Sequence, residues 1–111
     1  MPEKIQYEVS DRIATVTINR PERRNAMTAA MNKEFHKKIR EAGEDDSVQV
    51  IIVTGAGGSF CSGTDLSDLD AQSSEDQVKE ADAMERSEVF WPILHNPKPI
   101  IAAIDGYAVG M

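Results

Sequence analysis

The sequence predicts an α/β protein, and three observations lead to this class. Segments 5–9 and 13–18 alternate apolar and polar residues and are rich in β-branched side chains, which is typical of strands with one exposed face. An amphipathic helix pattern follows from about Thr28. Segments 48–55 and 99–104 are uniformly apolar, as in parallel strands that helices cover on both faces. A helix followed by such a buried strand indicates an α/β fold.

The first two strands are expected to form a hairpin. Ser10, Asp11 and Arg12 lie between them and make a tight connection. Pro21 ends the second strand, because proline has no backbone N–H to donate to a sheet.

The first helix has a recognisable start and a single apolar side. The Thr28 hydroxyl can cap the free amides of the first turn. Met31, Phe35, Ile39 and Ala42 recur at spacings of four and three, with lysines elsewhere around the helix. This apolar stripe is predicted to be core.

A second helix is predicted over residues 78–96, after a polar segment at 65–77 that is expected to be partly loop. Pro92 should kink or interrupt this helix. Its predicted buried side consists of Val78, Ala81, Met84, Phe90 and Leu94.

Length and composition bound the class of protein. The chain has 111 residues, which is one domain at most, and its 41% hydrophobic and 28% charged residues are typical of a soluble globular protein. No apolar run is long enough to cross a bilayer or to act as a secretory signal, so no membrane association is expected. The single cysteine, Cys61, excludes an intrachain disulfide and fits a reducing compartment. We therefore expect a cytoplasmic protein.

The net charge of −7 is unevenly distributed. Residues 41–88 hold 13 of the 19 acidic side chains and only 2 of the 12 basic ones, which argues against a nucleic-acid partner. Arg20, Arg23 and Arg24, set against Glu22, form a small basic cluster. This cluster suits a small polyanion, although a solvated turn with surface arginines is equally compatible with the charge pattern.

Both uniformly apolar strands run into turns of small residues, at 55–65 and 106–110, and parallel strands would bring these turns to the same edge of a sheet. Nucleotide motifs fit poorly, because Phe60 replaces the third glycine of G-x-G-x-x-G and Thr64 follows Gly63 where a P-loop needs lysine. Two interpretations stay open. The turns present backbone N–H groups to a carbonyl oxygen, as an oxyanion hole does, or they are tight turns with glycines at positive φ.

Three motifs in this chain resemble successive signatures of the crotonase, or enoyl-CoA hydratase/isomerase, superfamily. They are "INRPERRNAM" at 18–27, "GAGGSFCSGTDL" at 55–66 and "KPIIAAIDGYAVG" at 98–110, and together they span most of the sequence. The resemblance implies a crotonase-like ββα spiral that is incomplete here. It further implies that residues 1–111 are the N-terminal part of a single domain, without the rest of the spiral core and the trimerisation helices.

The resemblance also implies an acyl-CoA ligand whose thioester carbonyl lies between two backbone amides. These amides belong to Thr64 and Met111 by the positions of the motifs. The remaining ligand-binding residues implied in this way are Arg24 and Ala26 on the coenzyme A side, Ser62, Asp65 and Leu66 along the adenine and pantetheine path, Tyr107, Val109 and Gly110 around the acyl pocket, and Gly63 as a further substrate-binding or coenzyme A-binding residue.

The reaction implied by the resemblance is polarisation of the thioester followed by proton transfer from carboxylates. In the superfamily these carboxylates lie after the third motif, so the 111-residue chain alone is expected to show no turnover. Met111 after "AVG" resembles isomerase-like members more than hydratases. The expected assembly of the full-length protein is a homotrimer or hexamer, and coenzyme A enters with the substrate, so no separate cofactor is expected.

Alternatives to an enzyme are a truncated, non-catalytic fragment that binds acyl-CoA or associates with subunits, and a fragment without a function of its own. No metal site is expected at His36 or His95, because no cysteine or carboxylate stands at ligand spacing. Cys61 is interpreted as a packed or pocket-lining thiol. Glu80 and Glu85 are interpreted as solvated, and Asp65 as a cap for the helix that follows it.

Overall fold

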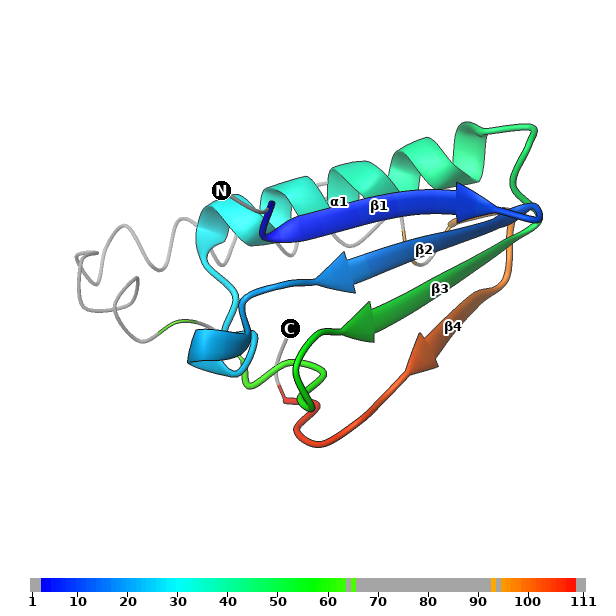
Figure 1. The fold of residues 1–111 in the computed structure, drawn as a ribbon. Coiled ribbons are helices and arrows are strands. Elements are labelled where there is room, and N and C mark those ends of the chain that lie inside the picture. Colours follow the sequence, from blue (N-terminus) through cyan, green and yellow to red (C-terminus); the bar gives the residue numbers. More distant parts are fainter. Residues whose placement is uncertain (1–2, 64, 66–92, 94, 110–111) are drawn as a thin grey trace.

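The computed structural model describes residues 3–63, 65, 93 and 95–109. The described strands form one sheet in the order β1-β2-β3-β4, and α1 lies along one face of it (Figure 1). The elements are β1 (Ile5–Ser10), β2 (Ile13–Ile18), the 3₁₀ turn η1 (Pro21–Arg23), α1 (Ala29–Glu44), β3 (Val50–Gly55) and β4 (Ile100–Ala103). The predicted α/β class is confirmed.

The predicted hairpin of β1 and β2 is also confirmed. The two strands are antiparallel, with Ile5 opposite Ile18 and Ser10 opposite Ile13. Asp11 and Arg12 form the turn, with φ values of 52° and 67°. Two successive residues with positive φ are typical of the type I′ turn, whose twist matches that of the flanking strands.

The other strands are parallel, which brings their carboxyl ends to one edge. Ile13 pairs with Val50 and Ile18 with Gly55, and α1 makes the connection between β2 and β3. β4 is parallel to β3, with Ile51 opposite Ile100 and Thr54 opposite Ala103. The exits of β3 and β4 therefore lie at the same end of the sheet, as the sequence predicts, and the exit of β2 lies there too.

Helix α1 begins and packs as its sequence predicts. The Thr28 hydroxyl accepts a hydrogen bond of 3.1 Å from the Met31 amide, so Thr28 is the N-cap. All four residues of the predicted stripe are buried. They join a core with inward-facing residues of the sheet, among them Val16, Ile18 and Ile51.

The far end of α1 is fastened to the segment that leads into β4. Lys98 Nζ donates to the Ala42 carbonyl at 2.8 Å and also to the Asp45 carbonyl. Asn96 Nδ2 donates to the Ile39 carbonyl at 3.1 Å. The carbonyls of Ala42 and Asp45 also accept from the backbone amides of Asp45 and Val48, at 3.3 Å and 3.0 Å. The two side chains therefore add donors at the end of α1 and fix the start of β4.

The prediction that β3 and β4 are buried on both faces is wrong. Ile51 and Val53 are buried, whereas their neighbours along β3 are only partly buried. On β4 the Ile101 side chain is 53% exposed, and Ile104 after it is 57% exposed. The reason is that α1 packs against β1 and β2, so it does not cover β4 at the edge of the sheet.

The predicted second helix and the polar segment before it fall almost entirely on residues 66–92 and 94, which lie outside the described part of the chain. Within the part that is described, no helix has the length and apolar character needed to span a membrane.

Candidate functional site

Three chain segments meet at the carboxyl edge of the parallel strands (Figure 1). We call them the arginine turn (residues 20–27), the β3 exit (residues 56–63 and 65) and the β4 exit (residues 104–109). Cys61 joins two of them, because its amide donates to the Tyr107 carbonyl at 2.7 Å and its carbonyl accepts from the Val109 amide at 2.9 Å. This parallel bridge continues the sheet pairing beyond the ends of β3 and β4.

Close backbone approach explains several glycines at this edge. A Cβ on Gly55 would lie 2.2 Å from the Ser59 carbonyl oxygen, and one on Gly106 would lie 2.4 Å from that of Gly58. Gly57 and Gly106 also have φ values of 77° and 67°, which favour glycine. Tight turns with positive φ are therefore present, and the glycines let the β3 and β4 exits pack directly on each other.

Asn25 is the buried centre of the arginine turn. Its φ of 59° is left-handed, a conformation that asparagine tolerates better than most residues. Its Oδ1 accepts from the Arg20 amide at 2.8 Å, while its Nδ2 donates to the carbonyls of Ala56 at 2.9 Å and Ser59 at 2.6 Å. One amide side chain thus holds the arginine turn against the β3 exit.

A short ladder of backbone hydrogen bonds joins the same two segments further along. The Ser62 amide donates to the Arg24 carbonyl at 3.1 Å. The Met27 amide donates to the Gly63 carbonyl at 2.8 Å, and the Met27 carbonyl accepts from the Asp65 amide at 3.0 Å. The β3 exit is therefore bonded on one side to the arginine turn and on the other side to the β4 exit.

An ion pair closes this arrangement. Arg20 Nη1 lies 2.5 Å from Asp65 Oδ2, and their side chains are 14% and 5% exposed. The same Nη1 donates to the Ala26 carbonyl at 3.2 Å. Arg20 was grouped with Arg23 and Arg24 as a cluster for a polyanion, but its charge is compensated by Asp65, which leaves the two exposed arginines for that role.

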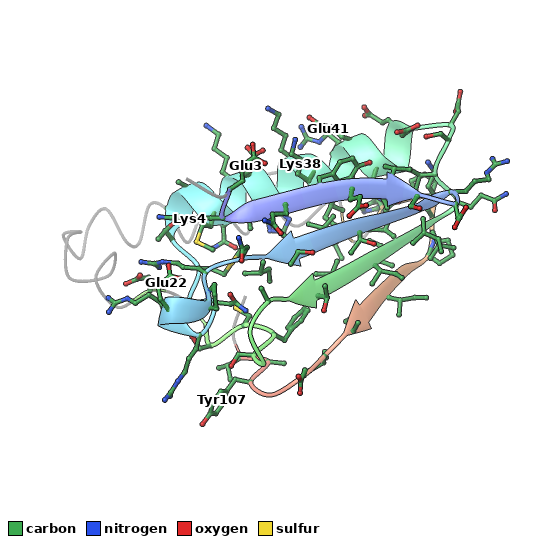
Figure 2. All side chains as sticks on the ribbon, viewed as in Figure 1. Glu3, Lys4, Glu22, Lys38, Glu41 and Tyr107 are labelled. Atoms are coloured by element: carbon green, nitrogen blue, oxygen red, sulfur yellow. The ribbon has the colours of Figure 1, made fainter. Side chains whose placement is uncertain are left out.

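Arg24 and Tyr107 approach each other across the β3 exit. The Arg24 guanidinium carbon lies 5.8 Å from the centre of the Tyr107 ring, a cation–π distance. Figure 2 shows Tyr107 at the loop end of the sheet. Tyr107 is 56% exposed and Val109 is 55% exposed. The exposed ring of Tyr107 thus adjoins the exposed guanidinium group of Arg24.

Seven of the residues proposed from the sequence meet at this edge of the sheet. They are Arg24, Ala26, Ser62, Gly63, Asp65, Tyr107 and Val109. Their roles toward a ligand stay predictions, and the buried Asp65 carboxylate is turned to Arg20. Thr64, Leu66, Gly110 and Met111, as well as the helix that Asp65 was expected to cap, lie outside the described residues.

The sequence reasoning missed Asn25 and the partner of Arg20. A signal was available for Asn25, because asparagine next to a proline-started turn is a common left-handed residue. No local signal joins Arg20 to Asp65, since they are far apart in the sequence and the fold brings them together.

Cys61 has the environment of a packed thiol. It is buried, and burial raises its pKa, although the Gly63 amide, 3.4 Å from Sγ, acts in the opposite direction. Among the residues that the structure describes, no three His, Cys, Asp or Glu side chains gather as a metal site would require.

Comparison with known proteins shows the family. The model of the family described as "Enoyl-CoA hydratase/isomerase" matches residues 8–111. The chain belongs to the enoyl-CoA hydratase/isomerase family. As the sequence predicts, this is the crotonase superfamily.

Relatives in this family are much longer than the chain. It is 41% identical over 98 residues to the probable enoyl-CoA hydratase 1, peroxisomal, of Arabidopsis thaliana. This match covers 87% of this chain and 35% of the relative. It is 32% identical to the 1,2-epoxyphenylacetyl-CoA isomerase of Escherichia coli, covering 99% of this chain and 43% of the relative. The chain therefore spans well under half the length of these relatives.

Solved structures of the family have the same fold. The enoyl-CoA hydratase/isomerase of Xanthobacter autotrophicus Py2 superposes with a TM-score of 0.81 at 34% identity, covering 96% of this chain and 40% of that one. The enoyl-CoA hydratase of Mycobacterium tuberculosis H37Rv gives a TM-score of 0.72 at 33% identity, covering 94% and 40%. The predicted crotonase-like fold, present in part, is confirmed.

Proposed function

We propose that the protein carrying this sequence is an acyl-CoA enzyme of the hydratase/isomerase type that polarises a thioester carbonyl between two backbone amides. The observation that carries the proposal is the meeting of the β3 and β4 exits at one edge, joined through Cys61 and Ala108. Two amides, of Thr64 and Met111 next to these exits in the sequence, can converge on one oxygen only if the exits lie side by side. The β3 and β4 exits do lie side by side.

The first donor in this proposal is the amide of Thr64. Its neighbours Gly63 and Asp65 both bond to Met27, the first through its carbonyl and the second through its amide. In a parallel ladder the amide between two such bonded groups is not used by that partner. We propose the amide between these two residues as the donor to the substrate, because Met27 holds its neighbours on both sides.

The second donor is the amide of Met111, two residues after Val109. Val109 is hydrogen-bonded to Cys61 at 2.9 Å, which ties the β4 exit to the β3 exit just before the proposed donor. Losing one such donor typically costs about 10²–10³ in rate, so backbone geometry at this edge would control the reaction.

The exposed Arg23 and Arg24 are proposed to attract the phosphates of coenzyme A, and Tyr107 and Val109 to border the acyl group. Guanidinium groups bind phosphate oxygens in a fork, and an exposed apolar surface beside them suits an acyl chain. Coenzyme A is thus part of the substrate and no separate cofactor is invoked. Nucleic acid and membrane are not proposed as partners.

The acid/base carboxylates are proposed to lie in parts of the longer protein beyond these 111 residues, and the isomerase-type reaction is favoured over hydration. By the same resemblance this sequence forms the N-terminal part of the domain and the complete protein is a homotrimer or hexamer. The 111-residue chain alone is then expected to show no turnover. A cytoplasmic location stays a prediction.

Two assays on the full-length protein test the proposal. One follows the hydration of crotonyl-CoA, and the other follows conversion of a 3-enoyl-CoA to the 2-enoyl isomer. Activity in either supports the enzyme, and a faster isomerisation supports the isomerase-type assignment. Absence of both, with acyl-CoA still bound, would favour the non-catalytic alternative.

A further inference from the structure

The Arg20 side chain links the end of β2 to both sides of the Met27 ladder. Its Nη1 lies 2.5 Å from Asp65 Oδ2 and donates to the Ala26 carbonyl at 3.2 Å. Ala26 precedes Met27 in the chain, and Asp65 is the residue whose amide bonds to Met27. One guanidinium therefore braces the arginine turn and the β3 exit at the same place.

This ion pair is shielded from water, with 14% of the Arg20 side chain and 5% of the Asp65 side chain exposed. Exposed ion pairs contribute little and adapt easily, but a buried pair fixes its geometry, because removal of one partner leaves a charge without compensation. The shielding also keeps the carboxylate away from a ligand at the surface. Asp65 and Arg20 can thus act on a substrate only through the backbone that they hold.

We propose that Arg20 and Asp65 are positioning residues, which hold the backbone of Gly63 and Asp65 on either side of the proposed Thr64 donor. This inference rests on the proposed function. It removes Arg20 from the polyanion cluster and gives Asp65 a role other than lining the adenine and pantetheine path.

The backbone contacts around the pair support this role. Asp65 is held twice, by its amide on Met27 and by its carboxylate on Arg20. Gly63 is held on Met27 by its carbonyl and has a φ of 109°, so its own backbone can move easily if the hold on Asp65 is lost. A displacement of about 1 Å at a catalytic group can cost about 10²-fold in rate.

The experiment uses the full-length protein that carries this sequence, with the variants Asp65→Asn and Arg20→Lys. Asp65→Asn keeps the size of the side chain but removes its charge. Arg20→Lys keeps the charge but replaces the guanidinium, whose Nη1 reaches both Asp65 and Ala26, with the ammonium of a shorter side chain. The matched control is Glu34→Gln, which removes an exposed carboxylate 3.6 Å from Lys38 on α1.

Three quantities are measured for each variant: kcat and KM for the reaction that the wild type catalyses, the Kd of free coenzyme A, and the infrared stretching frequency of the carbonyl in bound butyryl-CoA labelled with ¹³C at the thioester. We expect kcat to fall about 10- to 100-fold in Asp65→Asn and less in Arg20→Lys, as misplacement of a donor predicts. The Kd of coenzyme A should stay within about threefold, and the carbonyl frequency should move toward its value in water. Glu34→Gln should match the wild type.

Two results would overturn the inference while leaving the proposed function intact. One is an unchanged kcat and carbonyl frequency in both variants. The other is a loss of coenzyme A affinity in Arg20→Lys with unchanged kcat, which would make Arg20 a ligand-binding residue. If Asp65→Asn does not fold, Arg20→Lys alone decides between these outcomes. A wild type with neither turnover nor a carbonyl shift would instead contradict the proposed function, and this inference with it.

Discussion

The Nδ2 atom of Asn25 lies 2.6 Å from the carbonyl oxygen of Ser59, and this contact joins two turns that are far apart in the sequence. Asn25 is completely buried and has a left-handed backbone. Asn25 affects the stability of the fold in two ways, through its side-chain hydrogen bonds and through its tolerance of a left-handed backbone. Substitutions can separate the two effects.

Asn25→Ala is expected to destabilise the protein by about 2–4 kcal/mol, because it leaves two partly buried carbonyls without this donor and puts alanine, which tolerates positive φ less well than asparagine, at this position. Asn25→Gly loses the same hydrogen bonds but tolerates the conformation, so it should cost about 1 kcal/mol less. Urea unfolding of the two variants measures the difference. Equal losses would contradict a contribution from the backbone conformation.

Gly106→Ala and Gly58→Ala form a second matched pair at the candidate site. Both glycines have positive φ, at 67° and 86°, so alanine is strained at either position. A Cβ on Gly106 would meet the Gly58 carbonyl oxygen at 2.4 Å, whereas one on Gly58 would point into open space. Gly106→Ala should therefore cost at least about 1 kcal/mol more in unfolding free energy, because backbone atoms must shift. Similar urea midpoints for the two variants would show that the exits do not pack as described.

Local patterns predicted the elements well, because their causes are local. Thr28 precedes the apolar stripe of α1 and caps it, and alternation of residues defined the hairpin. The burial of β4 was predicted wrongly for a related reason. The sequence "IIAA" shows that the strand is apolar, but it does not show which elements cover the strand. The exposure of Ile101 depends on that covering.

The candidate site was predicted in outline and not in detail. Parallel pairing of β3 and β4 follows from the sequence, and it brought Ser62 and Tyr107 to one edge as expected. The pairing of Arg20 with Asp65 depends on how two loops fold over each other, for which the sequence holds no periodic signal. Charge alone therefore assigned Arg20 to the wrong cluster.

Lys98 is expected to stabilise the end of α1 through its hydrogen bonds to the carbonyls of Ala42 and Asp45. Lys98→Met keeps most of the stem but removes the charged donor, and should cost about 1–2 kcal/mol in unfolding free energy. Lys37→Met on the exposed side of α1 is the control and should change stability by less than about 0.5 kcal/mol. Thermal unfolding compares them, and equal melting temperatures for the two variants would rule out this capping role.

His36 should make the stability of the protein depend on pH. Burial lowers its pKa in the folded state, and the nearby positive charge of Arg40 lowers it further. The unfolded chain, with a histidine pKa of about 6.5, therefore binds a proton before the folded protein does. Since protons then favour the unfolded state, the contribution of neutral His36 is present above pH 6.5 and is lost as the pH falls toward the folded pKa.

The urea midpoint of the wild type should accordingly fall more steeply from pH 7.5 to pH 5 than that of His36→Gln, which has no group to protonate at this position. His95→Gln changes an exposed histidine outside α1 and should leave the contribution of His36 in place. If His36→Gln instead kept the full slope of the wild type, the pH dependence would have to come from other groups. The buried position of His36 on α1, beside the edge of the Phe35 ring at 5.3 Å between ring centres, would then have no consequence for proton binding.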